Sequence, residues 1–107
     1  MTQFKDRGKG FEAKFQQDQE LQFKVMARRN KLLGLWAAEK LGMEGDAAAA
    51  YAKEVVVSDF DEPGDNDVLR KVLNDLKGKG VDASEHSVRR EMDRLLDKAK
   101  EQISSEV

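Results

Sequence analysis

Apolar residues recur along the chain in four segments, at spacings that place them on one side of an α-helix. Two of the predicted helices cover residues 18–41 and about 47–60, a third follows Asp65, and a fourth follows Ser84. The four apolar stripes are Leu21, Val25, Leu32 and Trp36; Tyr51, Ala52, Val55, Val56 and Phe60; Val68, Leu69, Val72, Leu73 and Leu76; and Val88, Met92, Leu95, Leu96, Ala99 and Ile103. Four amphipathic helices joined by short loops predict an all-α protein, a small four-helix bundle.

Residues typical of helix ends separate these segments. Asp65 and Ser84 are predicted N-caps, because their side-chain oxygens can accept hydrogen bonds from the first turn of a helix. Glycine suits the position that follows a helix, since it adopts a positive φ without strain. The remaining boundary residues are Gly42, Gly45 with Asp46 as a third predicted N-cap, Pro63 and Gly64, and Gly78 and Gly80.

The first 17 residues differ from the rest and are called the N-terminal arm here. Three phenylalanines, Phe4, Phe11 and Phe15, lie in an otherwise polar stretch that Gly8 and Gly10 interrupt. Each glycine costs about 1 kcal/mol in a helix interior, and short unpacked helices are marginal. The sequence therefore predicts a flexible arm over residues 1–17 and a four-helix domain over residues 18–107.

The arm nevertheless carries a pattern that a helix would align. Phe4 and Phe11 are seven residues apart, and Phe11 and Phe15 are four apart, so the rings would share one side of a helix. An apolar stripe that forms only on folding is typical of a segment that binds a groove as a helix. The alternative is that Phe11 and Phe15 extend the first helix and pack on the bundle.

Composition and charge exclude several classes of protein. Charged residues make up 37% of the chain but nearly cancel to −2, which argues against a nucleic-acid binder. The absence of cysteine excludes disulfides, thiolate nucleophiles and cysteine-based metal sites. No apolar run is long enough for a membrane span or a signal peptide, so we expect a cytoplasmic protein without membrane insertion. Residues 1–41 are basic, whereas residues 42–66 contain one lysine against seven acidic residues.

Candidate catalytic and metal sites are weak. His86 has no partner at the spacing that a catalytic arrangement needs, and we interpret it as a surface residue. A calcium loop that starts at Asp59 would place Gly64 at its sixth position, but Arg70 stands where the twelfth requires glutamate. We therefore expect no catalytic residue, no metal and no cofactor.

One basic cluster leaves two interpretations open. Arg28, Arg29 and Lys31 lie on the first predicted helix, where they spread around most of its circumference. They form either a solvated helix face or a contact for an anion, such as a partner surface or a weakly bound nucleotide. Trp36, in the middle of an apolar stretch, is expected in the core.

Several blocks of the sequence have the residue order of a known family. They are residues 11–15, 23–24, 27–39, 51–56, 59–60, 64–68 and 88–90. The longest and most specific runs Ala-Arg-Arg-Asn-Lys-Leu-Leu-Gly-Leu-Trp-Ala-Ala-Glu over residues 27–39. The chain resembles the alphaproteobacterial zeta subunit, the inhibitor of the F-type ATP synthase.

The resemblance implies a regulator rather than an enzyme. In such proteins the arm enters the catalytic interface of the ATPase head, formed by the alpha, beta and gamma subunits, and blocks rotation in the hydrolytic direction. The arm residues that it implies are Phe4, Asp6, Arg7, Phe11, Glu12, Lys14 and Phe15. The protein would lie in the cytoplasm beside the inner-membrane synthase. This chain departs from the family at Lys5, Gly8, Lys9 and Gly10, where acidic and helix-favouring residues are usual. The alternative function is a small helical nucleotide-binding or protein-adaptor domain with weak or no inhibition.

Overall fold

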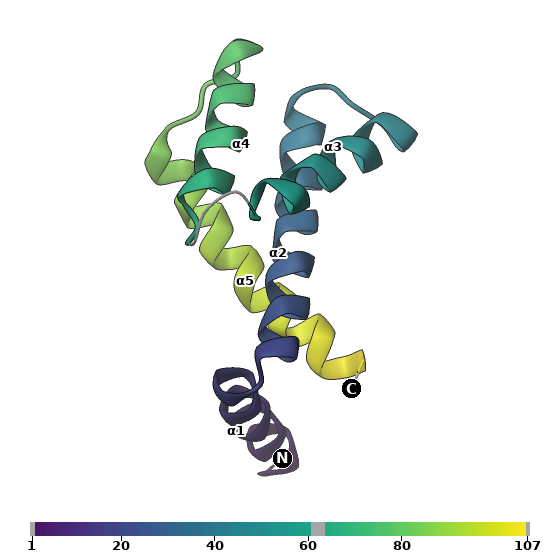
Figure 1. Cartoon of the computed structure of the whole chain (residues 1–107), viewed down its shortest axis with the longest axis vertical. Coiled ribbons are helices and arrows are strands. Elements are labelled where there is room, and N and C mark those ends of the chain that lie inside the picture. The colour runs from purple at the N-terminus through teal and green to yellow at the C-terminus, as the bar shows by residue number, and fades with distance from the viewer. Residues whose placement is uncertain (1, 61–63, 107) are drawn as a thin grey trace.

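The structure is a computed structural model of the chain. It describes the backbone of residues 2–60 and 64–106, and the side chains of residues 10–60 and 64–106. These residues form five α-helices and no strand: α1 (Thr2–Gln17), α2 (Gln19–Lys40), α3 (Gly45–Ser58), α4 (Asn66–Gly78) and α5 (Glu85–Glu106). In Figure 1, α2 runs through the middle of the molecule, with α3 and α4 at one end and α1 at the other. No described helix is long and apolar enough to cross a membrane.

The central helix α2 packs against each of the other four helices. It crosses α3 closely at Gly34, which lies beside Ala52: a Cβ at Gly34 would stand 2.5 Å from the Cα of Ala52. Around this crossing lies the main core, to which α2, α3, α4 and the first half of α5 contribute. Its buried residues are Leu33, Ala37, Ala38, Leu41, Tyr51, Val55, Val68, Leu69, Val72, Leu76, Val88, Met92 and Leu95.

A second, smaller cluster lies where the first turns of α2 meet the last turns of α5. Its buried residues are Phe11, Leu21, Val25, Ala99 and Ile103. Phe11 comes from α1 and is only 8% exposed. The N-terminal arm is thus packed on the domain through this cluster.

The structure has five helices where the sequence predicted a four-helix bundle. Residues 2–17 are helical despite Gly8 and Gly10, and α1 breaks from α2 only at Asp18, whose carboxylate caps α2 by accepting from the N–H groups of Glu20 and Leu21. The prediction of a flexible arm rested on helix propensity, whereas its alternative had Phe11 and Phe15 packing on the bundle. Burial of a phenylalanine side chain contributes about 1.5–3 kcal/mol, which is comparable to the cost of two glycines in a helix.

The predicted helix ends are confirmed where the signal is local. Ser84 precedes α5, and its Oγ accepts from the N–H of Ser87 at 3.0 Å. Gly42 and Gly80 follow α2 and α4 with φ of 80° and 77°. Pro63, the predicted stop after the second stripe, lies outside the described residues.

Other boundaries and burial predictions are wrong. The helix expected at 47–60 is α3, which begins at Gly45 with Glu44 as N-cap in place of Asp46 and ends at Ser58. Because α3 ends there, Phe60 leaves the helical stripe and is 62% exposed rather than buried. The other stripe residues are buried or half-buried, and the half-buried ones are Leu32, Trp36, Val56, Leu73 and Leu96.

Candidate partner-binding surface

The second half of α1 carries the described residues of the predicted inhibitory arm. Phe11 and Phe15, one helical turn apart, lie with ring centroids 6.4 Å apart and planes 20° from parallel. Phe11 is buried in the second cluster, and Phe15 is half-buried beside it. The predicted alignment of these two rings on one side of a helix is therefore confirmed. Both rings pack on the protein's own domain, as the alternative interpretation expected.

A charged contact fixes the same stretch of α1 to α5. Lys100 Nζ lies 2.9 Å from Oε1 of Glu12 and 4.6 Å from the ring centroid of Phe15. Lys100 thus binds two of the predicted arm residues at once, by an ion pair and by a cation–π contact. A pair this exposed contributes about 0.2–1 kcal/mol, and a cation–π contact at a surface about 0.5–1 kcal/mol.

The remaining arm residues divide into two groups. Lys14 is exposed in the last turn of α1, where a cation interacts favourably with the helix dipole. The side chains of Phe4, Asp6 and Arg7 lie outside the described residues.

Neither interpretation of the basic cluster, a solvated helix face or an anion contact, holds for Arg29. Its side chain is 2% exposed, so it belongs neither to a solvated face nor to an accessible anion site. Nη2 and Nη1 donate to the two carboxylate oxygens of Asp65 at 3.0 and 3.2 Å, and Nε and Nη2 donate to Oδ1 of Asn30 at 3.0 and 2.8 Å. Arg29 therefore ties the middle of α2 to the start of α4.

The same contact changes the role of Asp65. It occupies the N-cap position of α4, as predicted, but its side chain makes no capping hydrogen bond because both oxygens bind Arg29. A buried guanidinium needs a charged partner more than a helix end needs one particular acceptor.

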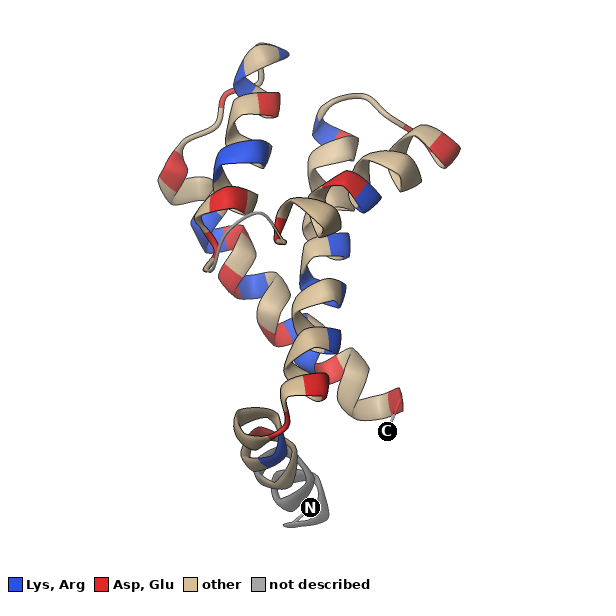
Figure 2. Cartoon of the chain, in the orientation of Figure 1, with Lys and Arg blue, Asp and Glu red and all other residues tan. Residues whose placement is uncertain are grey.

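The other two basic residues are more accessible. Arg28 is half-buried and donates to Oε1 of Gln102 at 2.8 Å, while its Nη2 lies 2.9 Å from Oε2 of Glu106. Lys31 is exposed on α2. Figure 2 shows basic positions at successive turns of α2, but two of the three predicted anion contacts bind acceptors elsewhere in the protein: Arg29 binds Asp65, the N-cap of α4, and Arg28 binds Gln102 on α5. The cluster does not converge on one anion site.

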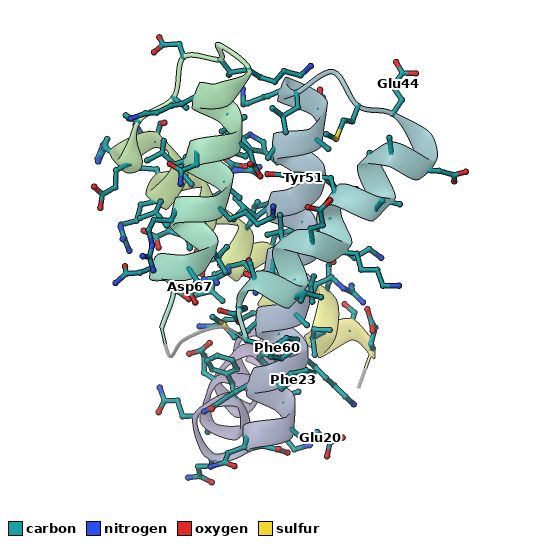
Figure 3. All side chains as sticks on the ribbon, turned by 45° about the horizontal axis from the view of Figure 1, so that its top comes forward. Glu20, Phe23, Glu44, Tyr51, Phe60 and Asp67 are labelled. Atoms are coloured by element: carbon teal, nitrogen blue, oxygen red, sulfur yellow. The ribbon has the colours of Figure 1, made fainter. Side chains whose placement is uncertain are left out.

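Sequence reasoning missed an exposed aromatic pair. Phe23 and Phe60 are 56% and 62% exposed, and their rings stack with centroids 5.9 Å apart (Figure 3). A shallow pocket beside them is lined in part by Met26 and Val56. The signal available was Phe23 itself, an aromatic residue off the apolar stripe of its helix.

A polar cluster joins α3 to α4. The Tyr51 hydroxyl donates to Oδ2 of Asp75 at 2.8 Å, and Lys71 Nζ donates to Asp75 at 3.1 Å and to Glu54 at 3.2 Å. Burial, the hydrogen bond to Asp75 and the two nearby negative charges raise the pKa of Tyr51. Burial lowers the pKa of Lys71, but its hydrogen bonds to Asp75 and Glu54 outweigh burial and raise it above its ordinary value.

The described residues offer no metal-binding arrangement. No three histidine, aspartate or glutamate side chains among them are close enough together to hold an ion. His86 is exposed at the start of α5, as predicted. The candidate partner-binding surface is α1 together with the part of the domain that it covers, because most of the candidate contact residues lie there.

Comparisons with known proteins agree with a resemblance over nearly the whole chain. A family model described as "ATPase inhibitor subunit zeta" matches residues 1–102. A solved structure titled "Solution NMR structure of the protein" is 54% identical, covers 81% of this chain and 99% of its own, and superposes with a TM-score of 0.72. No curated protein matches the chain.

Proposed function

The chain belongs to the ATPase inhibitor subunit zeta family, and from this premise we propose that it inhibits ATP hydrolysis by an F-type ATP synthase by means of its N-terminal arm. The single observation that carries the proposal is the family match, which begins at residue 1 and therefore includes the arm. The arm would enter the catalytic interface of the ATPase head and block rotation in the hydrolytic direction.

The shape of the molecule supports this mechanism. The 16 residues of α1 make a rod about 24 Å long and 10–12 Å wide. It lies at one end of the molecule, away from the main core (Figure 1). Four packed helices are at least twice as wide as one, so a cleft that admits α1 excludes α2–α5. The domain would thus limit how far the arm enters.

The arm also carries suitable side chains for an interface. Aromatic residues that fill a pocket commonly contribute 2 kcal/mol or more to binding, whereas exposed charges mainly alter the association rate. The residues that we propose to contact the ATPase head are Phe4, Asp6, Arg7, Phe11, Glu12, Lys14 and Phe15. Phe15 is the sharpest single test among them: it is only half-buried in the free protein, whereas Phe11 is buried, so we expect its loss to affect stability less.

The test is ATP hydrolysis by the cognate ATPase, measured with the full chain, with residues 18–107 and with Phe15→Ala. We expect the full chain to inhibit, residues 18–107 to have no effect, and Phe15→Ala to inhibit about tenfold less well or worse. Lys53→Ala is the matched control, since Lys53 is exposed on α3, far along the sequence from the arm. Circular dichroism melting of each variant separates lost contact from lost folding.

Two results would contradict the proposal. One is a cognate ATPase that hydrolyses ATP at the same rate with and without the full chain. The other is equal inhibition by the full chain and by a folded fragment of residues 18–107, which would place the inhibitory surface on the domain.

A further inference from the structure

Three of the seven arm residues that we propose to contact the ATPase head face the domain in this structure. Phe11 is buried among α2 and α5 residues, Glu12 pairs with Lys100, and Phe15 lies under the Lys100 ammonium group. The buried Phe11 ring cannot contact another protein at the same time, and Lys100 occupies the Glu12 carboxylate and one face of the Phe15 ring. We propose that this contact, called the arm clasp and defined by Phe11, Glu12, Phe15 and Lys100, is autoinhibitory: the arm must leave α5 before it can enter the ATPase head. The inference rests on the proposed function.

The arm clasp is built to open without unfolding the domain. Among the described residues, side-chain contacts join α1 to α5, and the backbone hydrogen bonds of α1 run within the helix and to the N–H group of Asp18. One further hydrogen bond joins the Gln22 side chain to the carbonyl of Gln16. Opening therefore requires a turn about Asp18 and the loss of a few side-chain contacts.

The main core does not depend on the arm. None of its buried residues comes from α1, whereas the second cluster takes one of its five from there. Opening would uncover Leu21, Val25, Ala99 and Ile103 while the larger core stays intact. The second cluster would then be the part of the domain that an open arm exposes to solvent.

The clasp predicts a quantitative relation between opening and inhibition. If only the open form binds, the apparent dissociation constant equals the intrinsic constant divided by the open fraction. A change on α5 that favours opening should therefore tighten inhibition by the same factor, although α5 itself need not touch the ATPase. An isolated helix of this length is marginal in water, so an opened α1 should also lose protection of its amides from hydrogen exchange.

Lys100→Glu tests this relation without changing the arm. The substitution replaces the ion pair with Glu12 by repulsion and removes the cation from the Phe15 ring. Lys98→Glu is the matched control: it makes the same charge change on α5 at an exposed position about 200° around the helix, with no part in the clasp. Both variants are compared with the wild-type full chain.

Two measurements are made on each protein. Hydrogen exchange of the backbone amides of residues 13–17, followed by NMR, reports opening without any ATPase. Titration against the cognate ATPase gives the inhibition constant. We expect Lys100→Glu to lower amide protection about three- to tenfold and to tighten inhibition by a similar factor, while Lys98→Glu changes neither by more than about twofold.

Other outcomes overturn the proposal. Unchanged protection in Lys100→Glu would mean that Lys100 does not hold the arm. Lower protection with weaker or equal inhibition would mean that the docked arm is the inhibitory form. If neither wild type nor variant inhibits, the proposed function fails and the regulatory role fails with it, whereas the exchange data still report separately whether the clasp exists.

Discussion

Replacing Asp65 by asparagine should destabilise the domain far more than its position in a surface turn suggests. Asp65 binds Arg29 through both carboxylate oxygens, and the Arg29 side chain is almost completely buried. Asparagine keeps the shape and one acceptor oxygen but removes the charge. The variant would leave a guanidinium with only one full partner, the side-chain oxygen of Asn30.

The size of the expected stability loss follows from the exposed fractions of the Arg29 and Asp65 side chains. Removing one partner of a fully buried ion pair costs about 3–5 kcal/mol, because the other charge stays buried without compensation. Asp65 is 38% exposed, so water can reach its side of the pair and the loss is smaller. We expect a loss of about 2 kcal/mol, which corresponds to a fall in melting temperature of roughly 8–12 °C for a domain of this size.

The assay is urea denaturation at pH 7, with unfolding monitored by circular dichroism. The midpoint should fall while the slope of free energy against urea concentration stays the same, since the native fold is retained. Asp82→Asn is the matched control: Asp82 is exposed between α4 and α5, and we expect a change within about 0.5 kcal/mol. The double variant Arg29→Met with Asp65→Asn should lose less than the sum of the single losses, because Asp65→Asn costs little once the cation is gone.

Two results would refute this reasoning. If Asp65→Asn costs no more than Asp82→Asn, the buried guanidinium does not depend on its charged partner. If the two single losses add in the double variant, the residues act independently and the contact between α2 and α4 contributes nothing as a pair.

Three further predictions use the same unfolding measurements. Gly34→Ala should destabilise the domain by about 1–3 kcal/mol because the new Cβ would meet the α3 backbone. Gly10 faces open space, so Gly10→Ala should stabilise α1 by up to about 1 kcal/mol. Equal effects of the two substitutions would contradict the close crossing of α2 and α3. Phe11→Ala should cost about 3 kcal/mol and Phe15→Ala about 1 kcal/mol, since only the first ring is buried; the reverse order would mean that α1 docks through another face. The pKa of Tyr51 is raised only in the folded protein, so the free energy of unfolding should fall as pH rises above about 10, by up to about 1.4 kcal/mol per pH unit. Tyr51→Phe should flatten this fall. Parallel profiles of the variant and the wild type would exclude this tyrosine as the cause.

The helical spacing of apolar residues was enough to find α2, α3, α4 and α5 in the sequence. This spacing is a local signal, because it involves residues within a few turns of one another. Ser84 and Gly42 mark helix ends for the same reason: a cap acts on a backbone group three or four residues away. The all-α fold class was accessible on this basis, as was the alignment of Phe11 and Phe15, whereas the family was indicated by the resemblance of whole blocks such as residues 27–39.

What the stripes could not give is the partner of each side chain. Arg29 and Asp65 are 36 residues apart and Glu12 and Lys100 are 88 apart in the chain, so no local pattern links them. A sequence pattern records which residues share a helix face, but not which helix that face meets.

The arm illustrates the division most directly. Its own sequence, with two glycines and no packing partner nearby, determines a weak helix. Only the tertiary structure brings the first turns of α2 and the last turns of α5 together and so creates the apolar cluster that receives Phe11. Helix propensity is a sum of small local free energies, whereas the burial of one aromatic ring depends on surfaces that exist only after distant helices have packed.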